Sequence, residues 1–432
     1  MLVALTFGLR YFCLEKKRKV CFPFAFRLLF SIFAPDMAKR IIGFDAKRIV
    51  RNATGLGNYC RTLVNDLAQV VPEDWQLRLY TPDAGREALR SQVAESQQLQ
   101  YVYPEGRPLK IQRSWWRVGP IVRDLQRDGV SLYHGLTGEL PQGLRQAGIP
   151  SVVTIHDLIF LRHPEYYHWL DTKIYAWKFR TACREANRII AISERTKQDI
   201  IELGGVDPDR IDVIYQSCSP RFAAEVSPQQ AAEVRGRYGL PSRFMLSVGS
   251  IEERKNIGLA VRALHRLPED IHLVAVGKTT KYAEKIAVEA RREGLEGRVH
   301  LLHGVPDADL QALYHEAEVF VYPSRYEGFG IPIIEAIHSG LPVVGATGSC
   351  LEEAGGPDCL YVSPDDPEAL AAAVSQLLKG SEGREQHISR SRDYVRRFEG
   401  HNVAGQVLDV YRELLKIAPL RAGVQRRFLS AY

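Results

Sequence analysis

The segment from Glu318 to Ala346 constrains the fold of this chain more than any other part of the sequence. Residues 319–322 are apolar and either β-branched or aromatic, which is typical of a buried strand. A loop with two glycines follows, and Pro332 then suits the first turn of a helix, because the N–H group that proline lacks has no partner there. Gly340 is expected to end this helix in the left-handed conformation, before a second buried strand begins at 343–344. The segment therefore predicts a strand–loop–helix–strand unit of an α/β domain.

The loop of this unit has the composition of a site for an anion and a sugar. It follows the carboxyl end of a strand, where open α/β sheets bind ligands. The N–H groups of Gly330 and Ile331 would project from the helix N-terminus toward a phosphate, and Gly328 would allow close backbone approach. Glu327 and Glu335 flank this position eight residues apart, and a carboxylate accepts hydrogen bonds from paired hydroxyl groups. Together these features predict a nucleotide-sugar site, whereas either glutamate alone is explained by solvation or by the helix dipole.

The pattern E-G-F-G-I-P-x-x-E at residues 327–335 resembles the E-x7-E signature of the retaining nucleotide-sugar glycosyltransferases of family 4, and S-G-x-P-V-V at 339–344 extends the match. The resemblance covers residues 37–417. It implies an α/β protein with the GT-B fold, in which two doubly wound Rossmann-like domains face a cleft. It also implies that Glu327 orients the sugar hydroxyls, that Glu335 holds the ribose, and that Phe329 belongs to the donor-binding loop.

Length and charge limit the other classes of function. A chain of 432 residues is too long for one core, and 45% hydrophobic with 25% charged residues is ordinary for a globular protein. The net charge is +6, but residues 1–36 hold six basic and two acidic residues, so the remainder gives no reason to expect a nucleic-acid partner. The seven cysteines are scattered and lack C-x-x-C spacing, which favours free thiols in a reducing, cytoplasmic compartment.

The sequence suggests four segments. Residues 1–36 carry two apolar runs, each too short to span a bilayer, and Met37 precedes a basic pair and a strand as a normal initiator would. We interpret 1–36 as a leader from a mis-assigned start, and a basic membrane-surface anchor is the alternative. The resemblance then implies an N-terminal acceptor-side domain at 37–218, a C-terminal donor domain at 219–400, and a helix at 401–432 that returns to the N-terminal domain.

Two further sites are expected in the first of these domains. Gly55 and Gly57 open an amphipathic helix, but Cys60 replaces the third glycine of a dinucleotide fingerprint, and the glycines come nine residues after the strand, which opposes a dehydrogenase. The resemblance implies instead a glycine-rich loop near the donor phosphates. His156 follows the predicted strand at 151–155; a His-Asp pair is usually structural, whereas the resemblance implies contact with the transferred sugar.

In the second domain, Arg254 and Lys255 follow a predicted strand and Gly249. Two fixed positive charges there suit a diphosphate leaving group, although exposed basic pairs are common on any surface. The resemblance places both cations on the diphosphate. It also implies that the strand ends at Gly277 and Gly304 hold the nucleobase through their backbone.

Neither a metal nor a cofactor is expected. The D-x-D patterns at 207–209 and 307–309 are explained by a turn and a helix cap, and H-x-x-H at 300–303 lacks further ligands. The aromatic-rich stretch 162–182 and the pair Trp115-Trp116 are predicted to pack as core, with acceptor or membrane-surface contact as the alternative for 162–182.

The stretch I-G-F-D-A-K-R with G-L-G-N-Y resembles bacterial mannosyltransferases of surface-polysaccharide assembly. The resemblance implies GDP-mannose as donor, a glycan or lipid-linked acceptor, and a cytoplasmic protein with peripheral contact to the inner membrane surface. A non-catalytic nucleotide-sugar-binding subunit and a GT-B epimerase or phosphorylase remain as alternatives. The acceptor, the base, the linkage and the oligomeric state stay open.

Overall fold

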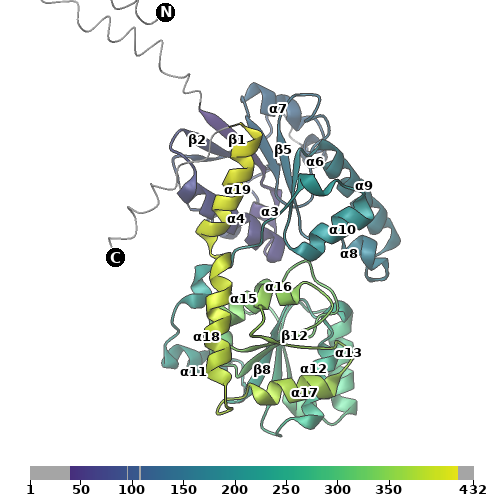
Figure 1. Ribbon diagram of the computed structural model, residues 1–432, viewed down its shortest axis with the longest axis vertical. Coiled ribbons are helices and arrows are strands. Elements are labelled where there is room, and N and C mark those ends of the chain that lie inside the picture. The colour runs from purple at the N-terminus through teal and green to yellow at the C-terminus, as the bar shows by residue number, and fades with distance from the viewer. Residues whose placement is uncertain (1–38, 95, 107–108, 417–432) are drawn as a thin grey trace, which may run out of the picture. The chain divides into compact units, whose positions relative to one another are not determined.

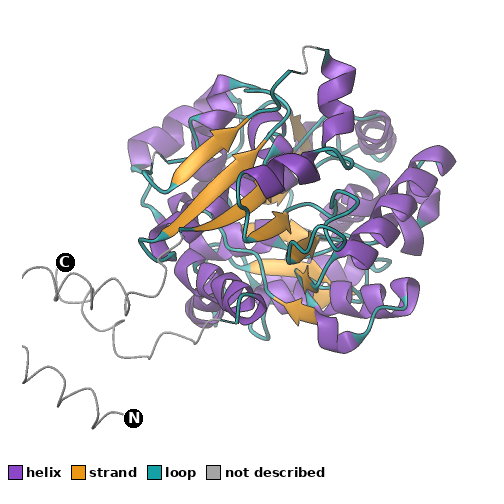
Figure 2. Cartoon of the chain, turned by 90° about the horizontal axis from the view of Figure 1, so that it is seen from above, coloured by secondary structure: helices purple, strands orange, loops and turns teal. Residues whose placement is uncertain are grey.

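The structure is a computed structural model that describes residues 39–94, 96–106 and 109–416. The described residues form two parallel sheets, one of seven strands in the order β3-β2-β1-β4-β5-β6-β7 and one of six in the order β10-β9-β8-β11-β12-β13. Helices lie on both faces of the strands (Figure 2). We call the seven-stranded part the first lobe and the six-stranded part the second lobe. The doubly wound α/β prediction is confirmed, whereas the domain limits at 218 and 400 stay predictions and the predicted leader 1–36 lies outside the described residues.

The strands of the first lobe are β1 (Arg40–Asp45), β2 (Trp75–Tyr80), β3 (Leu99–Val102), β4 (Leu132–Gly135), β5 (Ser151–Ile155), β6 (Arg188–Ala191) and β7 (Ile211–Val213). Those of the second lobe are β8 (Phe244–Val248), β9 (His272–Val276), β10 (Val299–Leu302), β11 (Val319–Tyr322), β12 (Val343–Ala346) and β13 (Leu360–Val362). All residues of β5, β11 and β12 are buried, as expected for strands covered on both faces. Parallel pairing places the loops that follow neighbouring strands at one edge of each sheet.

The helices of the first lobe are α3 (Lys47–Arg51), α4 (Gly55–Val70), α5 (Glu87–Arg90), α6 (Lys110–Trp116), α7 (Ile121–Arg127), α8 (Ile159–Arg162), α9 (Trp169–Glu185) and α10 (Glu194–Gly204). Those that follow in the chain are α11 (Pro228–Arg237), α12 (Ile257–Ala263), α13 (Lys281–Arg292), α14 (Asp307–Glu316), α15 (Ile331–His338), α16 (Leu351–Gly355), α17 (Pro367–Gln376), α18 (Arg384–Val395) and α19 (Gly400–Leu414). The short helix α3 was not expected from the sequence.

Helix α19 packs on the first lobe although it follows the whole second lobe in sequence. Figure 1 shows it in yellow beside α4. Val403, Val407 and Tyr411 are at most 2% exposed and join the core cluster of β1, β2 and α4. The Tyr411 hydroxyl also lies 2.6 Å from Nδ1 of buried His134 on β4. The core of the first lobe is therefore built from two segments that are distant in the sequence.

The prediction that the aromatic residues of 162–182 form helix core is wrong. Most of this stretch is helical, but Trp169 and Trp177 of α9 are 62% and 48% exposed. Trp115 is 65% exposed as well, whereas its neighbour Trp116 is fully buried and donates a hydrogen bond to Asp124 over 2.6 Å. Only one tryptophan of that pair therefore packs as predicted.

Candidate functional site

The loop between β11 and α15, which we call the donor loop (residues 323–330), lies as the sequence predicts. Gly330 is the N-cap of α15, Pro332 occupies its first turn, and Gly340 has a φ of +77° just beyond its end. A Cβ atom on Gly328 would lie 2.0 Å from the carbonyl oxygen of His156, and one on Gly330 would lie 2.8 Å from the Cβ of Ala354. Both glycines are thus required by close packing inside the protein.

The structure brings together three residues that the sequence singled out separately. Arg254 and Lys255 form a 3-10 turn soon after β8, and the donor loop places Glu327 against them. Lys255 Nζ lies 2.6 Å from Glu327 Oε1, and Arg254 Nη1 lies 2.8 Å from Oε2. The three side chains are between 10% and 15% exposed. We call these residues the cation cluster.

Charges within the cation cluster keep its members ionised. Burial raises the pKa of Glu327, but the positive charges of Lys255 and Arg254 outweigh this effect and hold it below its ordinary value. Burial lowers the pKa of Lys255, yet Glu327 leaves it above the usual range for lysine. Within the cluster, two cations and one carboxylate leave one net positive charge in a largely buried position, and Glu252, which lies 3.7 Å from Arg254 and is 48% exposed, opposes that charge only partly because water screens it. Such a charge attracts an anion strongly, because little water screens it.

Glu335 lies in a very different environment. It projects from the second turn of α15, and its Oε2 accepts a hydrogen bond from Tyr314 over 2.9 Å. Burial raises the pKa of Glu335 to about 7, and the Tyr314 hydrogen bond only partly opposes this shift. Glu335 therefore changes charge near neutral pH.

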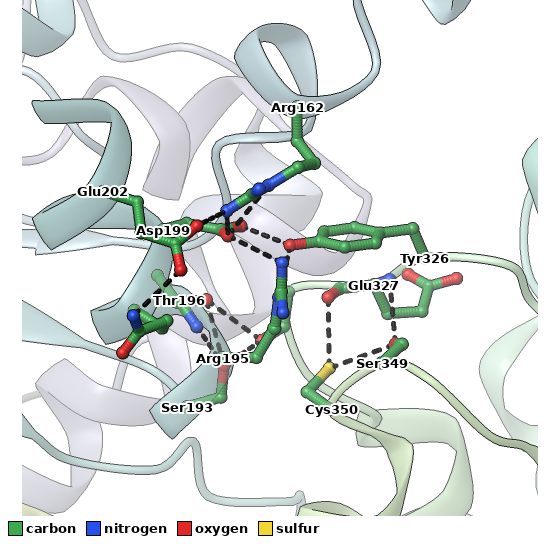
Figure 3. A network of polar contacts seen from close by, with 12 residues as sticks. Arg162, Ser193, Arg195, Thr196, Asp199, Glu202, Tyr326, Glu327, Ser349 and Cys350 are labelled. Carbon is green, nitrogen blue, oxygen red and sulfur yellow. Dashed lines mark hydrogen bonds and ion pairs between the residues drawn. The ribbon is translucent and has the colours of Figure 1, made fainter.

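A polar network joins the donor loop to α10 of the first lobe (Figure 3). The Tyr326 hydroxyl donates to Asp199, which is 1% exposed, and accepts a hydrogen bond from Arg195 Nε over 2.8 Å. Arg162 Nη2 pairs with the same carboxylate over 2.6 Å. We call these four residues the Tyr326 network. It fixes the residue that directly precedes Glu327.

Hydrogen bonds between side chains and backbone groups around the N-terminus of α10 strengthen the contact between the donor loop and the first lobe. Ser193 Oγ donates to the carbonyl of Gly328 over 2.7 Å. The Glu353 carboxylate accepts the N–H groups of Glu194 and Arg195 over 2.7 and 3.0 Å, at a helix end that favours negative charge. On the other side of the loop, Cys350 Sγ donates to the Glu327 carbonyl over 3.1 Å. The backbone of the donor loop is thus held from both lobes.

His156 lies at the end of β5, as predicted, but both of its ring nitrogens have protein partners. Nε2 donates to the carbonyl of Leu136 over 2.9 Å, and Nδ1 accepts from the Gln216 amide over 2.8 Å. Burial lowers the pKa of His156 to about 4, so the ring is neutral at physiological pH. A ring nitrogen of His156 can therefore hydrogen-bond to a sugar only if one of these contacts opens.

A cavity of about 240 Å³ adjoins His156 within the first lobe. Its lining includes two carboxylates, two cations and two tyrosines, namely Glu139, Asp157, Arg48, Lys178, Tyr167 and Tyr175, together with apolar side chains. Glu139 pairs with Lys178 over 2.8 Å, and burial raises the pKa of Asp157. Such a mixture of aromatic and hydrogen-bonding groups suits a polar organic ligand.

The other predicted donor-binding residues do not all have open surroundings. A Cβ on Gly57 would lie 1.8 Å from the Asn52 carbonyl, and one on Gly277 would lie 1.9 Å from the Gly249 carbonyl, so both are close-packed. Gly249 and Gly304 have φ angles of +146° and +66°, and no atom lies within 4 Å of a Cβ built on Gly55. Phe329 stacks on Tyr215 with ring centroids 5.3 Å apart, so its side chain is occupied by core packing. Their roles toward a donor stay predictions.

Comparison with known proteins agrees with this arrangement. Residues 53–219 match the family described as Glycosyltransferase Family 4, and residues 233–394 match Glycosyl transferases group 1. The chain is 32% identical over 289 residues to the O-antigen chain mannosyltransferase B of Escherichia coli, covering 66% of this chain and 74% of that protein. The chain belongs to the family 4 glycosyltransferases. The family predicted from the E-x7-E pattern is thereby confirmed.

Other similar proteins extend the comparison. This glycosyltransferase is 27% identical over 265 residues to the serotype-specific mannosyltransferase WbdA of Escherichia coli, covering 58% of this chain but only 32% of that longer protein. Its fold is similar to that of Anabaena HepE, solved in complex with UDP-glucose, with a TM-score of 0.66, 18% identity, and 87% and 99% of the two chains covered. The GT-B architecture predicted from the sequence is confirmed.

Sequence reasoning missed the Tyr326 network and the polar lining of the first-lobe cavity. Tyr326 directly precedes Glu327, which is a local signal, but no pattern links it to Asp199, which lies 127 positions earlier in the glycosyltransferase. Within the described residues, no group of three or more His, Cys, Asp or Glu side chains is arranged to hold a metal ion. In the same part of the chain, no helix has both the length and the apolar character of a membrane span.

Proposed function

We propose that the protein is a retaining, metal-independent hexosyltransferase that uses no cofactor. It would move mannose from a nucleoside-diphosphate sugar, GDP-mannose, to a hydroxyl of a glycan or lipid-linked glycan during cell-surface polysaccharide synthesis in the cytoplasm. The observation that carries this proposal is the cation cluster, where two buried cations share one carboxylate beside the N-terminus of α15. Similarity to the O-antigen chain mannosyltransferase B supports the choice of mannose and of the pathway class.

The cation cluster explains how a diphosphate leaving group could be bound and stabilised. Arg254 and Lys255 present fixed donors, and their attraction for the diphosphate grows as its charge develops during bond cleavage. The two cations would then pair partly with the diphosphate instead of with Glu327. The Glu327 carboxylate would thereby be able to accept hydrogen bonds from the sugar hydroxyls. Ionised Glu335 would accept the two ribose hydroxyls.

The first-lobe cavity is the place that we assign to the acceptor. Asp157 and His156 line it, and the Cβ of Asp157 would come within 3.0 Å of a Cβ built on Gly328, so the cavity adjoins the donor loop. Retention requires attack from the face that the diphosphate leaves. A phosphate oxygen held by Arg254 and Lys255 could accept the acceptor proton on that face.

Thermal unfolding with GDP, UDP, ADP and their sugars, each with and without EDTA, tests the donor assignment. A ligand at about 100 times its Kd stabilises a protein by about 2.7 kcal/mol, so binding raises the Tm measurably. We expect a GDP-selective rise that EDTA leaves unchanged and that Arg254→Gln abolishes. Arg266→Gln is the matched control, because its side chain is 67% exposed and pairs only with a surface glutamate in the described structure.

Product analysis separates the remaining alternatives. ¹H NMR of donor turnover with a mannan-oligosaccharide acceptor should show the donor's anomeric configuration in the product. Nucleotide binding without turnover would favour a non-catalytic subunit, and a changed sugar without transfer would favour an epimerase. No Tm rise with any nucleotide would overturn the donor site itself.

A further inference from the structure

Helix α9 carries an exposed apolar face that nothing in the described structure covers. Trp169, Leu170, Ile174 and Trp177 are 62%, 47%, 43% and 48% exposed, and we call them the aromatic face. Trp169 and Leu170 are adjacent, and Ile174 and Trp177 follow after four and three residues, so the four side chains fall within about 140° of the helix circumference. Large apolar side chains grouped in this way on a surface indicate an interaction site.

The charges on the same side of α9 are all positive. Lys173, Arg180 and Arg184 are exposed and fall between and beyond the aromatic positions in the helical repeat. Lys173 Nζ lies 4.9 Å from the centre of the Trp169 ring, so the cation is held at the edge of the aromatic face. The acidic residues of α9, Asp171 and Glu185, fall outside this stripe, and Glu185 is buried.

We propose that α9 docks on a lipid bilayer that contains anionic headgroups. Tryptophan and leucine insert at the boundary between headgroups and acyl chains, while lysine and arginine keep their charges among the lipid phosphates. A protein partner would account for the apolar side chains, but not for a stripe in which every exposed charge is positive. The combination therefore fits an anionic membrane surface best.

A second exposed apolar group belongs to the same surface region. Leu109, Ile111 and Trp115 at helix α6 are 58%, 76% and 65% exposed. One shallow pocket is lined both by Arg117, which directly follows α6, and by Trp177 of α9, so the end of α6 lies near the middle of α9. Two helices can thus reach the bilayer together, which increases the apolar area that binding removes from water.

The position of α9 links this docking surface to the assigned acceptor cavity. Its Tyr175 and Lys178 line the cavity that His156 and Asp157 also line. Docking at α9 would therefore hold the bilayer beside the helix that borders the assigned acceptor cavity, with Tyr175 on the other side of that helix from the aromatic face. This link rests on the proposed function, whereas bilayer docking itself requires neither donor nor acceptor.

Co-sedimentation with vesicles tests the docking surface directly. The full chain is mixed with vesicles of phosphatidylglycerol and phosphatidylethanolamine in equal parts, or of phosphatidylcholine alone. We expect binding to the anionic vesicles, with a blue shift of tryptophan emission, and at least about tenfold weaker binding as salt rises from about 0.05 M to about 0.5 M. Trp169→Ala combined with Trp177→Ala should weaken binding about tenfold or more, and each of Lys173→Gln and Arg180→Gln about fivefold.

Val288→Ala is the matched control, because Val288 is 63% exposed on α13 of the second lobe and should not affect vesicle binding. The Tm and the nucleotide response of the double tryptophan variant should equal those of the wild type, which separates loss of docking from loss of folding or of the donor site. Absence of binding to anionic vesicles at low salt would overturn the proposal. Unchanged binding in the double variant would overturn the assignment to α9, and self-association lost in that variant without vesicle binding would show an interface between copies of the chain instead.

Discussion

Glu327 and Glu335 come from one continuous loop-and-helix segment, yet their surroundings differ in the property that matters most for a carboxylate. Glu327 faces two cations at 2.6 and 2.8 Å, and its pKa lies below the ordinary value. Glu335 accepts a hydrogen bond from Tyr314, and burial raises its pKa to about 7. The two carboxylates of the E-x7-E pattern therefore have pKa shifts of opposite sign.

The opposite pKa shifts indicate that Glu327 and Glu335 would respond differently when a donor binds. Glu327 is ionised and already paired, so the donor must exchange partners with it. Glu335 is close to its titration midpoint at neutral pH, so hydroxyl donors from the ligand would draw it into the ionised form. On donor binding, Glu327 would exchange ion-pair partners, whereas Glu335 would lose a proton.

Removing the charge of Glu327 should have the largest effect. Glu327→Gln leaves Arg254 and Lys255 without their buried anion, since the remaining Glu252 carboxylate is exposed, and breaking a largely buried ion pair in this way costs about 3–5 kcal/mol of unfolding free energy. Urea unfolding measures this loss, and transfer should slow by about 100-fold or more. GDP should restore more stability in this variant than in the wild type, because its diphosphate supplies the missing negative charge.

Glu352→Gln is the control for that experiment, since Glu352 is exposed in the same lobe. If Glu327→Gln unfolds at the same urea concentration as this control, Glu327 does not stabilise the cation cluster. The difference that we describe between Glu327 and Glu335 would then be wrong.

Glu335 should produce a pH dependence of intermediate size. Its folded pKa of about 7 exceeds the ordinary 4.5, so the folded state binds this proton more tightly than the unfolded state. Its contribution to stability is therefore complete below pH 4.5 and is lost as pH rises through about 7, by at most about 3 kcal/mol. Glu335→Gln should remove this slope from the ligand-free protein.

Nucleotide affinity should change in the opposite direction, because the ribose hydroxyls donate to ionised Glu335. Calorimetric titration with GDP should show affinity that rises with pH up to about 7 and then levels off, with proton release on binding below that pH. An identical pH profile in Glu335→Gln would refute this assignment.

Weakening the Tyr326 network should give the smallest effect. This change tests whether the network acts on Glu327 without affecting Glu335. Tyr326→Phe keeps the ring and removes the hydrogen bonds to Asp199 and Arg195, at a cost of about 1 kcal/mol. Because Tyr326 adjoins Glu327, we expect kcat to fall severalfold while GDP affinity and its pH profile stay unchanged. Tyr103→Phe, at a residue 40% exposed, is the control. Equal losses in GDP affinity and kcat would show a general loosening of the site.

Much of the difference between Glu327 and Glu335 could not be predicted from the sequence. The strand–loop–helix–strand unit was predictable because glycine and proline mark its limits locally. The sequence singled out Arg254, Lys255 and Glu327 separately, and their meeting agrees with the rule that loops after neighbouring parallel strands share one edge. The Tyr314 hydroxyl that contacts Glu335 comes from a different helix, and the sequence contains no signal for its direction.

One expectation that stays untested and one that is wrong were limited by the same physical cause. His156 was expected to face a sugar, but Gln216, 60 positions away, occupies one ring nitrogen. The aromatic residues of α9 were expected in the core because aromatic side chains usually become buried. Composition gives the amount of apolar surface but not the side of the helix that the rest of the protein covers.

Helix α19 has a consequence for the order in which the protein can fold during synthesis. Residues 400–414 leave the ribosome only after the whole second lobe, yet Val403, Val407 and Tyr411 fill the core of the lobe that was made first. The second lobe is one continuous stretch of chain and can fold as soon as it emerges. The first lobe must wait with an open apolar surface beside α4, so the part translated earlier is completed later.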